Sequence, residues 1–130
     1  MLYYSVTEIY FEQGLKIAQA LDAYYAKHKK TIGPLHGLPI SFKDQFNLPG
    51  VDSTIGYIAF ANKPATKEST LVRLLLECGA VPYVKTNVPA TLMMGESVNN
   101  VWGRTVNPYK SVFALLLLVA ALTCRPKVDS

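Results

Sequence analysis

The sequence is poor in the residues that metal sites and disulfide frameworks require. Its 130 residues include two cysteines and two histidines. Two cysteines, Cys78 and Cys124, are too few for a disulfide framework, and their spacing is not that of a zinc site. We expect Cys78 to be a buried structural thiol. His28 and His36 have no cysteine or carboxylate cluster beside them. The sequence therefore predicts no metal site.

Charge is also scarce, at 17% of residues with a net charge of +4. The one dense basic cluster, Lys27–Lys30, falls where a helix is expected to end, and cations are favoured there by the helix dipole. Aromatic residues do not alternate with basic ones, so we expect no nucleic-acid partner. The N-terminus lacks a basic region followed by an apolar core, which predicts no signal peptide and a cytoplasmic location.

Hydrophobic residues make up half of the chain, which is typical of a globular domain. Ser5–Glu8 has the form of a capping box, and apolar residues then recur at helical spacing. The pattern predicts an amphipathic helix over residues 6–27. We expect its apolar face to contain Phe11, Leu15, Ala18 and Tyr25, with Leu21 beside them.

The next elements alternate between strand and helix. Residues 38–42 and 81–84 are short apolar runs of strand length, and a helix is predicted between them over residues 65–78. Thr66 is its expected N-cap and Gly79 its stop, with Leu71, Leu74, Leu75 and Cys78 on the apolar face. A strand, helix, strand order favours a parallel pair in an α/β fold.

Each predicted strand is followed by a lysine, Lys43 or Lys85. The carboxyl ends of parallel strands meet at one edge of a sheet, where ligands of α/β proteins bind. A lysine desolvated by apolar walls has a lowered pKa and can act as a base near neutral pH. The alternative is a lysine whose ammonium group reaches water from the end of the strand.

Three ordered segments resemble the amidase signature family, and most closely its fungal acetamidase-type members. They are Gly33–Phe46 (GPLHGLPISFKDQF), Gly79–Pro89 (GAVPYVKTNVP) and Trp102–Pro108 (WGRTVNP). The resemblance covers about residues 7–110. It implies an incomplete amidase-signature fold, a mixed sheet with packed helices, and hydrolysis of carboxamide C–N bonds without metal or organic cofactor.

The resemblance also implies a mechanism. In this family an uncharged lysine is the base, one serine relays the proton, and a second serine attacks the amide carbonyl to form an acyl-enzyme. Lys43 matches the family's lysine. Lys85 matches a neighbouring element that helps to build the site and is not carried over as catalytic.

The two serines belong to a Gly/Ser-rich stretch expected soon after Pro108, and the sequence does not contain it. Its last glycine is Gly103, and residues 111–130 are an apolar tail in which Ser111 has no such context. We interpret residues 1–110 as the N-terminal part of an amidase-signature domain. The tail is interpreted as an aberrant end, such as a frame shift, a retained intron or an alternative splice.

The prediction is therefore a chain of amidase descent that is inactive alone. One alternative is a non-catalytic protein that pairs with a full-length homologue through an unfinished sheet edge. Another is a fragment without a stable fold. Association with a membrane surface through residues 112–122 is less favoured, since about 11 apolar residues fall short of the roughly 18–20 that span a bilayer.

Overall fold

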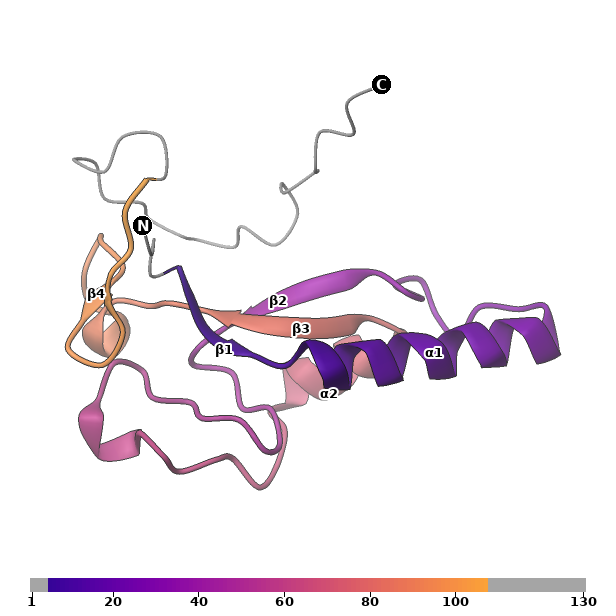
Figure 1. The fold of residues 1–130 in the computed structure, drawn as a ribbon, viewed down its shortest axis with the longest axis horizontal. Helices are drawn as coiled ribbons and strands as arrows, with labels where there is room; N and C mark the ends of the chain where they lie inside the picture. Colours follow the sequence, from indigo (N-terminus) through magenta and orange to yellow (C-terminus); the bar gives the residue numbers. More distant parts are fainter. Residues whose placement is uncertain (1–4, 108–130) are drawn as a thin grey trace.

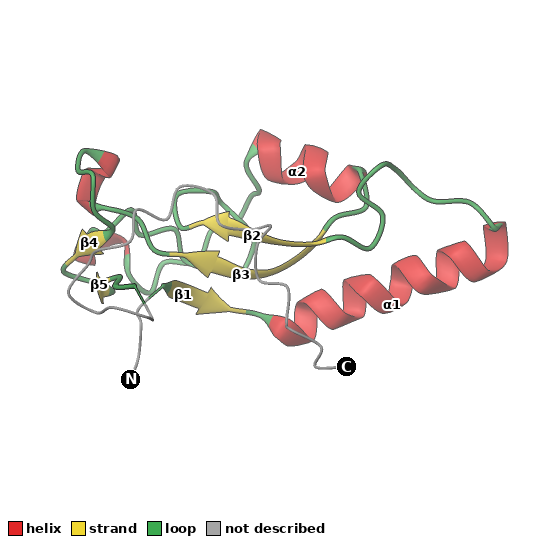
Figure 2. Cartoon of the chain, turned by 90° about the horizontal axis from the view of Figure 1, so that it is seen from above, coloured by secondary structure: helices red, strands yellow, loops and turns green. Residues whose placement is uncertain are grey.

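The centre of the structure, a computed structural model that describes residues 5–107, is a three-stranded sheet. Its strands are β1 (Val6–Ile9), β2 (Pro39–Lys43) and β3 (Val81–Thr86), in the order β1-β3-β2. In Figure 2 they lie side by side, with β2 parallel to β3 and β1 antiparallel to it. The predicted α/β class, the mixed sheet and the parallel pair are confirmed.

Two helices flank this sheet. α1 (Phe11–His28) runs out from the end of β1, and α2 (Thr70–Glu77) lies alongside β2 (Figure 2). The long loop between β2 and α2 lies below the sheet in Figure 1 and contains the short 3₁₀ helix η1 (Ile58–Phe60). After β3 come a second 3₁₀ helix, η2 (Ala90–Leu92), and a small hairpin of β4 (Val98–Asn99) and β5 (Gly103–Arg104).

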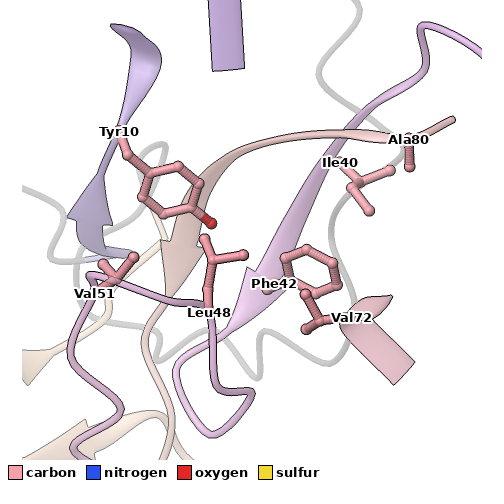
Figure 3. Close-up of a cluster of buried hydrophobic side chains, with 7 residues drawn as sticks. All are labelled: Tyr10, Ile40, Phe42, Leu48, Val51, Val72 and Ala80. Carbon is pink, nitrogen blue, oxygen red and sulfur yellow. The ribbon is translucent and has the colours of Figure 1, made fainter. Parts of the chain in front are cut away.

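The hydrophobic core fills the space between the sheet, that loop and α2 (Figure 3). β2 contributes Ile40 and Phe42, and α2 contributes Val72, which is completely buried. Tyr10 closes the β1 side, where its hydroxyl donates to the Val84 carbonyl at 3.0 Å and burial raises its pKa. The core is completed by Leu48, Val51 and Ala80.

The predicted start of the first helix is wrong. Residues 6–9 form β1, and α1 begins at Phe11 without a side-chain cap, so the Ser5–Glu8 capping box does not exist. β1 is bonded along β3, where Glu8 pairs with Lys85. Because β-branched Val6 and Ile9 suit a strand, pairing with β3 outweighs the local helix signal.

The predicted apolar face of α1 is also corrected. Gly14 and Leu21 are the buried residues of the helix, whereas Phe11, Leu15 and Tyr25 are exposed. Gly14 approaches the β3 backbone closely, so the helix turns the side of Gly14 toward the sheet rather than the side that carries Leu15. Phe11 still stacks on Tyr83 of β3, with ring centroids 6.0 Å apart.

The second helix is shorter than predicted. α2 begins at Thr70 after an N-cap at Ser69, and not at Thr66. The residues just before Ser69 are not helical, because Ala65 is bonded to an earlier part of the same loop. The Gly50 N–H donates to the Ala65 carbonyl, and the Ala65 N–H donates to the Val51 carbonyl. The buried residue is Val72, with Leu75 and Leu76 partly buried, while Leu71 and Leu74 are exposed. Cys78 is half-buried rather than buried.

The segment after β3 agrees with the sequence in part. Pro89 suits the first turn of a helix and predicts a helical turn over residues 89–94. The structure has the short η2 there, with left-handed backbone angles at Thr91 (φ 58°, ψ 8°). The turn-rich residues 95–108 predict an irregular loop, but its described part contains the β4–β5 hairpin. Asn99 explains the hairpin, because its Oδ1 accepts from the Val101 and Trp102 N–H groups across the turn. The tail expected over residues 111–130 lies outside the described residues.

Gly14→Ala tests the contact between α1 and β3. An alanine would improve helix propensity by about 1 kcal/mol. Its Cβ would lie 2.8 Å from the Pro82 carbonyl oxygen, so we expect a net loss of about 1–2 kcal/mol in the free energy of unfolding.

Urea denaturation measures this, with Ala23→Gly at an exposed position of α1 as the control for propensity alone. A Gly14→Ala chain more stable than the wild type would show that the helix does not approach β3 as described.

Candidate functional site

The register of the parallel pair decides where the two strand-end lysines lie. Lys43 pairs with Thr86 and Phe42 pairs with Lys85. Paired residues share a face of a sheet and successive residues alternate. Lys43 and Lys85 are therefore at the same carboxyl edge, as the sequence predicts, but on opposite faces. Lys85 is on the core face with Phe42.

Lys85 is the largest fully buried side chain among the described residues, with 0% of its surface exposed. Its Nζ donates to the Asp52 carbonyl at 2.6 Å and to Ser53 Oγ at 2.8 Å. The Ser53 hydroxyl donates onward to the Phe46 carbonyl at 3.2 Å. One ammonium group thus fastens the loop after β2 to the end of β3.

Burial lowers the pKa of Lys85 from 10.5 to about 8. The negative charges of Asp44, Glu8 and Asp52 act against this shift by favouring the ammonium form. Glu8, its partner on β1, has a raised pKa, mainly because it is partly removed from water. Lys85 is thus a desolvated lysine at the end of a strand, the environment that the sequence analysis considered for both strand-end lysines.

Asp44, the residue after Lys43, is fully buried and organises the same loop. Its Oδ2 accepts from Thr54 Oγ1 at 3.0 Å and from the Ile55 N–H at 2.7 Å. Trp102 Nε1 donates to the same Thr54 hydroxyl at 3.0 Å. Trp102 therefore fixes the hairpin loop to the body of the protein.

A second buried polar group joins the hairpin to β3. Asn99 Nδ2 donates to Asn87 Oδ1 at 2.7 Å and to the Val88 carbonyl at 2.8 Å. Asn87 Nδ2 in turn donates to Thr105 Oγ1 and to the Gly103 carbonyl, both at 3.1 Å. These two amide side chains hold the end of β3 against the β4–β5 hairpin.

Lys43 has a different environment. It is half-buried, on the face of the sheet opposite Lys85, Asp44 and the core. Its backbone is fixed, since the Asp44 N–H donates to the Thr86 carbonyl and the Phe46 N–H donates to the Lys43 carbonyl. Its side chain thus starts from a rigid strand end and can still meet another group.

Lys85 and Ser53 meet the distance criterion for a lysine that activates a serine, and a pKa of about 8 suits a base. Their geometry does not suit attack on a substrate. Lys85 is closed to solvent, and the Ser53 proton is directed to a backbone carbonyl. This pair stabilises the loop.

The remaining candidates add no site. A hollow of about 330 Å³ is lined by Ser53 and the loop residues 63–67 and includes neither strand-end lysine. Within residues 5–107, no three His, Cys, Asp or Glu side chains gather as a metal ion would need. In that same range no helix has both the length and the apolar character to cross a bilayer.

Comparison with known proteins identifies the architecture. A sequence model of the amidase family matches residues 2–113. The chain belongs to the amidase signature family. kk1C of Curvularia clavata, a protein named as an amidase, is 67% identical over 103 residues, which are 79% of this chain and 19% of that protein. The acetamidase of Emericella nidulans is 54% identical over 101 residues, or 78% of this chain and 18% of that one.

Solved structures agree with the sequence relatives. A fatty acid amide hydrolase matches with a TM-score of 0.78 and 38% identity, over 83% of this chain and 19% of that chain. The peptide amidase of Stenotrophomonas maltophilia matches with a TM-score of 0.71 and 28% identity, over 83% and 23%. The chain thus spans about a fifth of the length of these relatives, and it has the amidase-signature fold in part.

The sequence does not predict the residues that organise the loop. Asp44 and Thr54 bond to each other across ten residues, a separation that no local sequence pattern marks. Asn99 lies in a turn-rich segment, and its position there does not predict its bond to Asn87. A usable signal was the cluster of asparagines and threonines after two buried strands, since such short polar side chains commonly bond to nearby backbone.

The lowered pKa of Lys85 predicts a pH dependence of stability. Between about pH 8 and 10.5 the unfolded chain binds a proton that the folded chain does not, so this group's contribution to the free energy of unfolding rises with pH. Lys85→Met lacks the group. We expect the wild type to gain about 3 kcal/mol at most over Lys85→Met between pH 7.5 and 10.

Urea titrations of both chains at several pH values give the difference in their free energies of unfolding. Titratable groups that the two chains share contribute equally to both and drop out of this difference. Lys27→Met, at the exposed end of α1, is the control. A wild-type minus Lys85→Met difference that does not change with pH would contradict the burial of this ammonium group.

Proposed function

We propose that this chain is the N-terminal part of an amidase that hydrolyses carboxamide C–N bonds, with Lys43 as its base. The match of the whole described body to amidases, with β2 and β3 carrying the family segments to one sheet edge, supports this proposal most. Relatives named acetamidase favour small carboxamides as the substrate class.

In the proposed reaction, neutral Lys43 takes a proton through one serine from a second serine, whose oxygen attacks the amide carbonyl. The proton then passes to the leaving nitrogen as the C–N bond breaks, and water hydrolyses the acyl-enzyme. A half-buried lysine on a fixed strand end suits this role, because it is held in place and still reachable.

Both serines must come from outside the described residues, since the sequence has no Gly/Ser-rich stretch after Pro108. We therefore expect no turnover from the chain by itself. The purified chain and its Lys43→Ala variant, assayed on a panel of small carboxamides, should both stay at background. Turnover that disappears in Lys43→Ala would mean that the chain supplies its own nucleophile, contrary to the proposal.

A chimera tests the role of Lys43 directly. Residues 5–107 would replace the aligned segment of the Emericella nidulans acetamidase, to which the chain is 54% identical. We expect an active chimera, and a loss of about 10²–10⁴-fold in kcat when Lys43→Ala removes the base.

Lys27→Ala, at the end of α1, is the matched control and should keep full activity. An active chimera that tolerates Lys43→Ala would contradict the assignment. The folded state of each variant is checked by thermal denaturation, so that a loss of kcat is not confused with a loss of fold.

The second candidate is a non-catalytic protein that pairs with a full-length homologue. Its support is the sheet order β1-β3-β2, which leaves the outer edges of β1 and β2 without a further strand among residues 5–107. Such edges can accept another strand. The cytoplasmic location expected from the sequence stays a prediction, as does the division into residues 1–110 and 111–130.

A further inference from the structure

Three polar side chains from separate segments meet at the end of β2, and we call them the strand-end clamp: Asp44, Thr54 and Trp102. At its centre, Thr54 Oγ1 donates to Asp44 Oδ2 and accepts from Trp102 Nε1, both at 3.0 Å. It also accepts from the Gly56 N–H at 3.2 Å. A hydroxyl has one proton and two lone pairs to offer, so the hydroxyl of Thr54 is fully used. Asp44 and Thr54 have no exposed surface, and water therefore cannot take over their bonds.

The acceptor in this clamp is a buried carboxylate. Asp44 Oδ2 accepts a second bond, from the Ile55 N–H at 2.7 Å. Its Oδ1 is also buried and has no hydrogen-bond partner among residues 5–107. Both side-chain bonds of Asp44 thus come from the turn at residues 54–55, and bonds to a charged acceptor are stronger than bonds between neutral groups. This turn therefore determines where Asp44 lies.

The backbone of the same turn is strained. Ile55 has a φ of 51°, in the left-handed region, which is unusual and costly for a β-branched residue. Gly56 follows with a φ of 77°, and a Cβ there would lie only 2.7 Å from the Cβ of Asn99. Strain of this kind persists only where the surrounding contacts fix it, and it is concentrated at functional sites. The turn thus has a conformation that its own residues do not favour.

The residue next to the clamp is Lys43. A lysine side chain is a flexible stem of four carbons, so the place of its Nζ depends first on the backbone from which it extends. The clamp lies on the other face of the sheet from Lys43 and acts on it through the Asp44 backbone. The β4–β5 hairpin, whose turn contains Trp102, lies beyond the carboxyl ends of β2 and β3 (Figure 2). The clamp therefore joins this hairpin to the strand end that carries the proposed base.

We propose that Thr54 is a positioning residue for Lys43. Its hydroxyl, acting through Asp44, holds the end of β2 in the orientation that proton transfer by Lys43 requires. This rests on the function proposed above. A displacement of about 1 Å at a catalytic group can cost about a hundredfold in rate, so a residue that never touches the substrate can still determine kcat.

The test uses the chimera with the Emericella nidulans acetamidase described above. Thr54→Val keeps the shape of the side chain and removes the hydroxyl. We expect it to lower kcat by about tenfold or more, with KM little changed because Thr54 does not bind the amide. Thr54→Ser keeps the hydroxyl and should recover most of the wild-type kcat.

Val72→Ala is the control for a merely structural effect. Val72 is fully buried in the core on α2, and its truncation should lower the Tm of the chimera at least as much as Thr54→Val does. We expect it to keep the wild-type kcat, because it leaves the clamp intact. A loss of kcat in Val72→Ala as large as in Thr54→Val would overturn the positioning role.

Trp102→Phe is the second variant, used if Thr54→Val does not fold. It removes the indole N–H that donates to Thr54 and keeps an aromatic ring in place. Its kcat should fall in the same direction with KM little changed. Wild-type kcat in the folded clamp variants, in a chimera that Lys43→Ala inactivates, would overturn this inference and leave the proposed function in place.

Amide hydrogen exchange tests the clamp without activity. In the full 130-residue chain, the Asp44 N–H is bonded to the Thr86 carbonyl and the Phe46 N–H to the Lys43 carbonyl. Both should exchange about tenfold faster or more in Thr54→Val than in the wild type. Faster exchange beside a chimera that tolerates Lys43→Ala supports the clamp and contradicts the proposed function. Unchanged exchange would overturn the clamp itself.

Discussion

The structure depends on one buried ammonium group. Lys85 has no exposed surface, and its Nζ donates to the Asp52 carbonyl and the Ser53 hydroxyl. A buried charge is costly unless it is hydrogen-bonded, so these two acceptors determine where the loop after β2 must lie. With that loop in place, Thr54 and Ile55 reach Asp44, and Trp102 reaches Thr54. The edge of the sheet is therefore held by a connected polar network rather than by apolar packing alone.

This arrangement separates two tasks that the sequence presents as similar. Both lysines follow short apolar strands, and both lie at the same sheet edge. Alternation along the strands sends Lys85 into the core and Lys43 to the opposite face. The enclosed lysine stabilises the fold, and the reachable one is available for the base role that we propose. A substitution at Lys85 should thus change stability first, and one at Lys43 should change chemistry.

The sequence could predict the parts of this fold that local patterns determine. The short apolar runs before Lys43 and Lys85 predicted a parallel pair, and the structure has β2 and β3 there. The local sequence could not predict that residues 6–9 form a strand. Their pattern is that of a helix start, but in the structure they pair with a strand more than 70 residues away. The side of α1 that is buried depends on how closely Gly14 approaches β3, which periodicity does not show.

Chemical labelling of the folded chain tests the separation of the two lysines most directly. Brief treatment with an amine-acylating reagent near pH 8, followed by peptide mass spectrometry, gives the rate at which each lysine reacts. The account predicts that Lys43 reacts in the native protein, whereas Lys85 is protected until urea unfolds the chain, although its lowered pKa favours the reactive neutral form. Native-state labelling of Lys85 as fast as that of Lys43 would show that Lys85 is not enclosed and would contradict the account.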